Sequence, residues 1–266
     1  MKFIPILFSL LLIPATISAQ DAVKRDEQQM HRLHNDPKSY IGALEDPKRD
    51  AYQKPQEVMM AFGLKPGEVI ADIGAGSGYF TFRLAHHIGD RGKVYAVDVS
   101  PDMILHINRR IRELKATNVV SILADPDDPL LPDASVNRFF FNDSWHHIDN
   151  QTKYLSLMKK MLKAGGEIVM IDFHKKDLPV GPPMQMKIAR EDLIKQMETN
   201  GFRLTKEHTF LPYQYFLVFM PKYIKRGILY TAQFPQWHLH KPNRVTKFPR
   251  MGIDLTSTPT VKISHQ

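Results

Sequence analysis

The stretch of sequence that decides the fold is Val69-Ile70-Ala71-Asp72-Ile73-Gly74-Ala75-Gly76-Ser77-Gly78. It joins an apolar run to three alternating glycines, and a helical pattern marked by Phe80, Leu84 and Ile88 follows directly. Glycine has no Cβ, so a strand-to-helix turn built this way lets backbone N–H groups approach a ligand closely. The stretch therefore predicts a ligand-binding loop at the carboxyl end of a buried parallel strand.

Strand and helix patterns alternate on the C-terminal side of this loop, which predicts an α/β fold with a mainly parallel sheet. The apolar stripe Ile104, Ile107, Ile111 and Leu114 predicts the buried face of a helix that begins after Ser100. Leu162–Gly165 is predicted to be a turn that precedes a strand. Further strands are expected at 94–99, 119–123, 136–141, 166–173, 203–208 and 215–219, the last two as an antiparallel pair.

Three acidic residues stand where predicted strands end. Asp72 lies just ahead of the glycines, and a carboxylate there favours a ligand with an amine over a pyrophosphate. Asp98 ends the second strand, where a carboxylate can accept hydrogen bonds from the hydroxyls of a ribose. Asp125 ends the third strand and is either a partner for the amine of adenine or part of a solvated acidic loop.

Taken together, the Asp-x-Gly-x-Gly-x-Gly loop, the two strand-end acids and the Leu162–Gly166 turn resemble the class I S-adenosylmethionine-dependent methyltransferases. The resemblance covers about residues 56–221, and Ala164 stands where the family usually has proline in the turn. It implies a Rossmann-like, seven-stranded, mainly parallel sheet with helices on both faces and the last strand antiparallel. It also implies S-adenosyl-L-methionine as cofactor, bound by Asp72, Gly74, Ala75, Gly76, Ser77, Gly78, Asp98, Val99, Asp125 and Asn142.

No catalytic residue can be assigned from the sequence. A base is needed only if the methyl acceptor must lose a proton, and His146 or His147 is a candidate for it. The alternative is that both histidines cap and pack the loop after the fourth strand. Asp172 and His174, at the end of the fifth strand, are further candidates as a base. Both residue types can also bind a metal ion, but no third potential ligand accompanies them, so no metal site is predicted.

The two ends of the chain differ from its centre. Residues 1–19 have the pattern of a signal peptide, which predicts export to the periplasm or the medium and no transmembrane helix in the mature chain. Residues 20–55 are predicted to form a helical extension. Residues 222–266 carry eight Lys and Arg against one acid, which predicts an irregular basic tail. The tail is a candidate for weak contact with an anionic membrane, and no strong nucleic-acid signal is present.

The chain has no cysteine, which excludes disulfides and thiolate chemistry.

The sequence therefore predicts transfer of a methyl group from S-adenosylmethionine to a small acceptor. One alternative is a non-catalytic S-adenosylmethionine-binding module of the cell envelope. Another is a nicotinamide-dependent oxidoreductase, which Asp72 and the presence of Tyr79 in place of a glycine disfavour.

Overall fold

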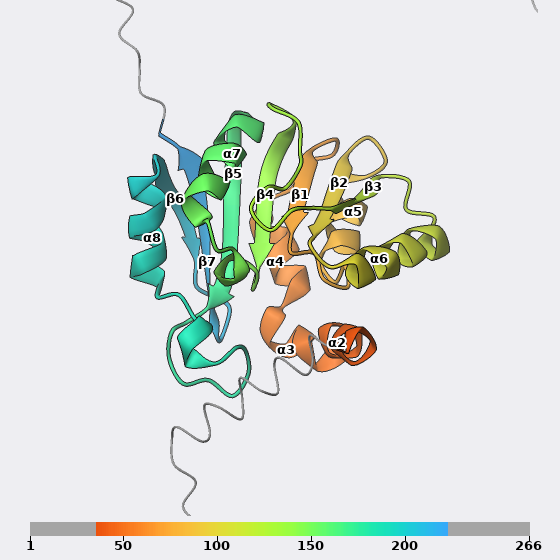
Figure 1. The fold of residues 1–266 in the computed structure, drawn as a ribbon, viewed down its shortest axis with the longest axis horizontal. Helices are drawn as coiled ribbons and strands as arrows, with labels where there is room; N and C mark the ends of the chain where they lie inside the picture. Colours follow the sequence, from red (N-terminus) through yellow and green to blue (C-terminus); the bar gives the residue numbers. More distant parts are fainter. Residues whose placement is uncertain (1–35, 223–266) are drawn as a thin grey trace, which may run out of the picture. The chain divides into compact units, whose positions relative to one another are not determined.

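The computed structural model describes residues 36–222, and the strands in this range form one seven-stranded sheet in the order β3-β2-β1-β4-β5-β7-β6 (Figure 1). The first five strands run parallel, and β7 is antiparallel to both β5 and β6. The predicted Rossmann-like sheet and its antiparallel last strand are thus confirmed. The strands are β1 (Val69–Ile73), β2 (Lys93–Asp98), β3 (Val119–Leu123), β4 (Val136–Asn142), β5 (Leu162–Phe173), β6 (Phe202–His208) and β7 (Gln214–Pro221).

Helices precede the sheet and connect its strands. The N-terminal group is α2 (Pro37–Leu44), the 3-10 turn η1 (Pro47–Arg49), α3 (Asp50–Gln53) and α4 (Pro55–Phe62). The connecting elements are α5 (Thr81–Ile88), α6 (Pro101–Leu114), η2 (Trp145–His147), α7 (Gln151–Met161), η3 (Met184–Met186) and α8 (Arg190–Thr199). Helix α6 begins after Ser100, as the sequence predicts. The side chains of Ser100 and, at α7, of Asn150 each accept a backbone N–H three residues ahead, which satisfies an otherwise unpaired donor.

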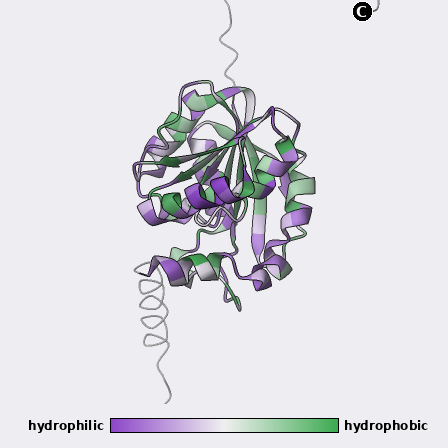
Figure 2. Ribbon diagram, turned by 90° about the vertical axis from the view of Figure 1, so that its right-hand side faces the viewer, coloured by the Kyte–Doolittle hydropathy of each residue, from purple (hydrophilic) through white to green (hydrophobic). Residues whose placement is uncertain are grey.

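Each face of the sheet carries its own apolar core. Side chains of α4, α5 and α6, including Val58, Leu84 and Ile107, pack on one face, and side chains of α7 and α8, including Leu155 and Met197, pack on the other. Figure 2 shows apolar strands in the middle of the molecule and hydrophilic residues on the helices around them. Because the strands are buried on both faces, they read as continuous apolar runs in the sequence.

Two local predictions are wrong. The predicted apolar stripe of α6 is wrong in part: Ile107 is buried and Ile111 packs against the core, but Leu114 is 51% exposed, and Met103 and His106 are the other buried residues. The predicted turn Leu162–Gly165 is instead the beginning of β5: Leu162 pairs with Val136, and the register shifts before the pairing resumes.

The predicted signal peptide at 1–19, the first part of the helical extension and the tail from residue 223 onward lie outside the described residues. The described part of residues 20–55 contains α2, η1 and α3. Between residues 36 and 222, none of the helices combines the length and the apolar composition that a membrane crossing requires.

Candidate functional site

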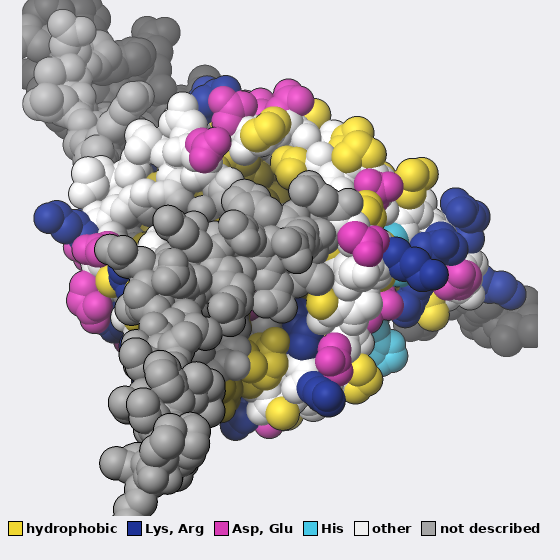
Figure 3. Space-filling view, turned by 60° about the horizontal axis from the view of Figure 1, so that its bottom comes forward, with side chains coloured by type: hydrophobic (Ala, Val, Ile, Leu, Met, Phe, Trp, Pro, Cys, Tyr) yellow, Lys and Arg dark blue, Asp and Glu magenta, His cyan; other side chains and the backbone are white. Residues whose placement is uncertain are grey.

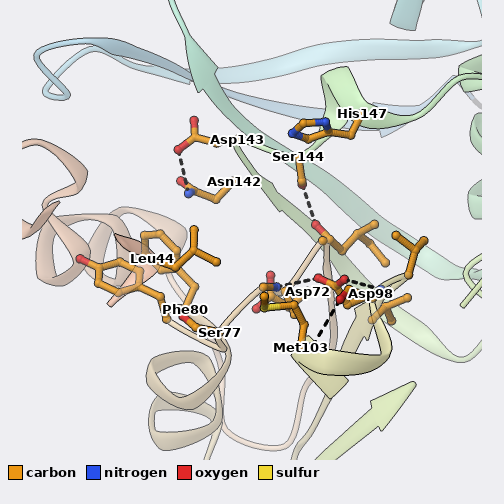
Figure 4. A pocket seen from close by; sticks show the side chains of 18 of the residues that line it. Leu44, Asp72, Ser77, Phe80, Asp98, Met103, Asn142, Asp143, Ser144 and His147 are labelled. Carbon is orange, nitrogen blue, oxygen red and sulfur yellow. Dashed lines mark hydrogen bonds between the residues drawn. The ribbon is translucent and has the colours of Figure 1, made fainter. Parts of the chain in front are cut away.

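A pocket of about 630 Å³ lies at the carboxyl ends of β1, β2, β4 and β5 (Figure 4). It lies where the strand order reverses, between β1 and β4, which is where open α/β sheets bind ligands. Its size is that of pockets that enclose a small organic ligand. All the residues predicted to bind the cofactor line it, except Gly78.

Residues Pro37–Gln53, here called the N-terminal cover, form one wall of the pocket. Tyr40, Leu44, Arg49 and Tyr52 are its main contributions to the lining. Figure 3 looks toward the end of the molecule that carries α2 and α3, and its visible part shows hydrophobic, acidic and basic side chains interspersed. The sequence predicts this segment to be helical but gives no signal that it contributes to the site.

The N-terminal cover is held mainly by polar contacts. Glu45 lies 2.9 Å from His106 Nε2 and 3.3 Å from Arg110, both on α6. Tyr79, which follows the glycine loop, donates from its hydroxyl to Asp50. The Arg49 guanidinium lies 4.5 Å from the centre of the Tyr79 ring, a cation–π contact. The cover is therefore attached to the glycine loop and to α6.

The glycine loop has left-handed backbone at Gly74, Gly76 and Gly78, with φ of 69°, 56° and 83°. The N–H groups of Gly74 and Ala75 both donate to the carbonyl of Val97, which fixes the loop to β2. A Cβ at Gly74 would lie 2.5 Å from Ser144 Cβ. Glycine is therefore required at position 74 for two reasons: the positive φ and the close packing against the loop after β4.

Gly78 has a different surrounding from the one predicted. It does not line the pocket, and a Cβ there would lie 2.8 Å from the ring of Phe82 on α5. Its lack of a side chain therefore serves the packing of the loop on the helix that follows.

Asp98 organises the loop and faces the pocket at the same time. One carboxylate oxygen accepts from the N–H of Gly76 at 2.8 Å, and the other accepts from the N–H of Ser100 at 2.9 Å. Burial raises the pKa of Asp98, while these backbone hydrogen bonds oppose the rise. The adjacent Val99 is 55% exposed, and Asp125 is an exposed lining residue at the end of β3.

Asp72 is 3% exposed and accepts a hydrogen bond of 2.6 Å from the hydroxyl of Thr81. Burial raises its pKa to about 7, with the hydrogen bond from Thr81 lowering it and the charge of Asp98 raising it. A cationic group placed in the pocket would stabilise the ionised form of this carboxyl.

Two buried polar atoms on residues of the pocket lining lack partners among the described residues. They are Ser77 Oγ and Asn142 Oδ1, both on lining residues. Buried polar atoms normally have hydrogen-bond partners, so each indicates a ligand with complementary polar groups. The Asn142 side chain donates to Asp143 at 3.1 Å, which leaves its oxygen for a ligand.

Next to Asn142 lies a buried side-chain network that no sequence pattern indicates. Asp143, which has a φ of 55°, accepts hydrogen bonds of 2.7 Å from Gln53 and from Gln214. Burial and the nearby charge of Asp172 raise the pKa of Asp143, and the two glutamine donors oppose the rise. The network joins the N-terminal cover, β4 and β7.

Only some of the candidate catalytic residues line the pocket. His146 lines the pocket, and its Nδ1 lies 3.0 Å from Oδ2 of Asp172, so the sequence candidates Asp172 and His146 form a pair. His174 does not line the pocket, and its ring packs 5.7 Å from that of Tyr215. His147 lines the pocket next to His146. Asp172 at the end of β5 thus pairs with His146 on η2.

The strand order, the glycine loop at the switch point and the acid at the end of β2 define the class I methyltransferase architecture, whose cofactor is S-adenosylmethionine. A family model described as "Methyltransferase domain" matches residues 64–215. The chain belongs to this methyltransferase family.

Relatives and solved structures agree with this assignment. The chain is 28% identical to a SAM-dependent methyltransferase from Aquifex aeolicus, with a TM-score of 0.67 over 70% of this chain and 98% of that one. A type 11 methyltransferase structure from Sulfolobus solfataricus is 25% identical, with a TM-score of 0.51 over 60% of this chain and 86% of that one.

The ubiquinone/menaquinone biosynthesis C-methyltransferase UbiE of a Shewanella species is 25% identical over 114 residues, or 42% of this chain. The match spans 45% of the length of that relative, so about half of it has no counterpart in the match. The family assignment argues against the nicotinamide oxidoreductase hypothesis.

Proposed function

We propose that this protein transfers the methyl group of S-adenosylmethionine to a small acceptor that binds beside Asn142 and His146. The observation that carries the proposal is a single pocket with two unlike ends. One end has the glycine loop and Asp98, and the other has His146, Tyr52 and Phe173. A methyl donor and an acceptor can therefore lie next to each other in one pocket.

The cofactor end supports a specific placement. We propose that Asp98 binds the ribose hydroxyls, that Asp125 lies beside the adenine, and that the loop of Gly74 to Ser77 holds the methionine part. Asp72 would face the amine, and the orphaned oxygens of Ser77 and Asn142 would accept hydrogen bonds from the ligand. When bound, the cofactor supplies a methyl group on a positively charged sulfur that leaves as a neutral thioether.

The acceptor end supports a compact, mostly apolar acceptor. Tyr40, Tyr52, Phe173 and Pro182 supply apolar walls, and the N-terminal cover closes the space. Holding the acceptor and the methyl carbon in line within a water-poor pocket is itself a large part of catalysis. The Shewanella relative is named for methylation in quinone biosynthesis, which agrees with an acceptor that has an apolar body.

Two measurements test the proposal. Titration calorimetry of the purified protein with S-adenosylmethionine and S-adenosylhomocysteine should show binding, and Asp98→Asn should weaken it by about 1–3 kcal/mol through loss of charge-assisted hydrogen bonds. Transfer of radiolabelled methyl groups to an extract of small molecules should then be detected. Lys153→Ala is the control variant, because Lys153 pairs with Asp127 on the exposed surface.

The outcomes separate the hypotheses. Binding of the cofactor without transfer to any acceptor fraction would favour the non-catalytic binding module. Absence of cofactor binding would reject both the methyltransferase and the binding-module hypotheses. We also propose that the protein acts after export, on the basis of the signal-peptide pattern at 1–19, and fractionation of the producing cells tests this.

A further inference from the structure

His146 and Asp172 form a buried pair at the acceptor end of the pocket. Their side chains are 3% and 2% exposed, and the distance from Nδ1 to Oδ2 is 3.0 Å. His146 comes from η2 after β4, and Asp172 comes from the end of β5. Asp172 does not line the pocket, whereas His146 does, so the carboxylate stands behind the imidazole as seen from the pocket.

The pair fixes which nitrogen of His146 carries a proton. An ionised carboxylate only accepts hydrogen bonds, so Nδ1 must donate to Asp172. Asp172 is itself held in place, because its other oxygen accepts from the backbone N–H of Phe173 at 2.8 Å. In the neutral imidazole Nε2 then has a lone pair. It is on the far side of the ring from Asp172 and is the nitrogen available to a ligand.

The surroundings of His146 are rich in groups that act on its charge. Asp172 and Asp143 are the nearby acids, and the ring of His147 lies 4.2 Å away, centre to centre. Arg49 of the N-terminal cover acts on Asp143 from the other side. Although burial lowers the pKa of His146, the hydrogen bond to Asp172 and the two carboxylates raise it above the ordinary value. The imidazole is thus suited to receive a proton near neutral pH.

This arrangement exceeds what positioning alone requires. A methyl acceptor with a lone pair and no acidic proton needs no base, and a buried His–Asp pair would then place costly polar groups in the pocket without use. The pocket that His146 lines is also lined by Tyr52, Phe173 and Pro182, and such apolar and aromatic walls suit a flat apolar body.

Resting on the proposed function, we infer that His146 is the catalytic base of methyl transfer and that the acceptor is a small aromatic molecule with an ionisable hydroxyl. Asp172 is the positioning residue that holds the tautomer. Nε2 takes the proton of the O–H group, and the oxygen forms a bond to the methyl carbon. The carbon–sulfur bond breaks and sulfur keeps its electron pair. The proton on the imidazole leaves to solvent with the products.

The first test needs no acceptor and no activity. Side-chain ¹⁵N NMR of the full chain, with His146→Gln to assign the signal, should show His146 protonated on Nδ1 in its neutral form. Asp172→Asn should lower the titration midpoint of His146 by about 0.5–1 pH unit, because the charge that raises it is removed. The control His86→Gln, on the exposed surface of α5, should leave the His146 signal unchanged.

The second test uses 4-nitrophenol, whose absorbance reports its ionisation, with protein saturated in S-adenosylhomocysteine. The wild type should bind the probe and increase its ionised fraction, and His146→Gln should abolish the increase. With S-adenosylmethionine, methylation of the probe should fall about 100-fold or more in His146→Gln. The affinity for the cofactor should remain that of the wild type.

Several results would overturn the inference. They are a proton on Nε2 in neutral His146, a titration of His146 that ignores Asp172→Asn, and failure of the loaded protein to bind the phenol. Unchanged methylation in His146→Gln, with the cofactor bound, would reject the base but leave the proposed methyl transfer standing. If the wild type does not bind the cofactor, the proposed function itself is rejected.

Discussion

The two ends of the pocket are built in different ways. The cofactor end consists of backbone and side chains from short contiguous segments, such as Gly74 to Ser77 and Asp98 to Ser100. The acceptor end consists of side chains brought together from distant parts of the chain, since Gln53 and Gln214 both donate to Asp143. The cofactor end can therefore bind the same cofactor whichever acceptor is used. The acceptor end can change its residues without disturbing the cofactor end.

The largest expected effect comes from the cofactor end. Gly74→Ala places a Cβ 2.5 Å from Ser144 Cβ and puts alanine at a φ of 69°. Left-handed strain and overpacking each cost about 1–3 kcal/mol, so the free energy of unfolding should fall by about 2–6 kcal/mol. Urea denaturation measures it. The control Gly42→Ala, in α2 with open space around it, should not destabilise. Equal stability of the two variants would contradict the account of this loop.

An intermediate effect is expected at the acceptor end. Gln214→Leu removes one donor to Asp143 and should lower the free energy of unfolding by about 1–3 kcal/mol, because a buried carboxylate loses a partner. Cofactor affinity should be unchanged, since the residue belongs to the other end. Burial already raises the pKa of Asp143 in the folded state, and losing a donor raises it further. The variant should therefore lose stability as the pH rises and approach the wild type in acid. A loss that is the same at pH 5 and pH 8 would show that Asp143 is not the partner affected.

The smallest expected effect is a pH dependence that belongs to the cofactor end alone. Burial raises the pKa of Asp72 to about 7 in the free protein, and an amine beside it favours the ionised form. Affinity for S-adenosylmethionine should thus rise with pH through about 7 and level off above it. Between pH 6 and pH 8 the gain should be up to about tenfold. Calorimetry in buffers of different ionisation enthalpy should detect proton release on binding below pH 7. Asp72→Asn should flatten the profile, and a slope that survives this change would assign it to another group.

The fold and the cofactor end were accessible from the sequence because their determinants are local. The apolar run before Gly74, the capping Ser100 and the alternation of strands and helices each act within a few residues. Asp98 could be placed because the carboxyl ends of parallel strands meet at one edge. Gly78 could not be separated from Gly74 and Gly76, since only the packing of Phe82 shows that it faces α5.

The acceptor end was not accessible because its determinants are pairings between distant residues. Nothing in the sequence near His146 indicates that Asp172 is its partner, since the pairing depends on the register of β4 against β5. The contributions of Tyr40, Arg49 and Tyr52 depend on where the helical extension packs. A helical pattern predicts the helix itself but not the surface on which the helix packs.

The attachment of the N-terminal cover has a kinetic consequence. Since Pro37–Gln53 form one wall of the pocket proposed to hold the donor and the acceptor, we expect displacement of this segment to speed the release of both products. Its outer contacts are partly exposed ion pairs, Glu45 with Arg110 and Asp50 with Arg83, and ions in solution weaken such pairs. The turnover number should then increase with moderate salt while single-turnover chemistry stays constant, so that the ionic strength of its surroundings sets the working speed of the enzyme.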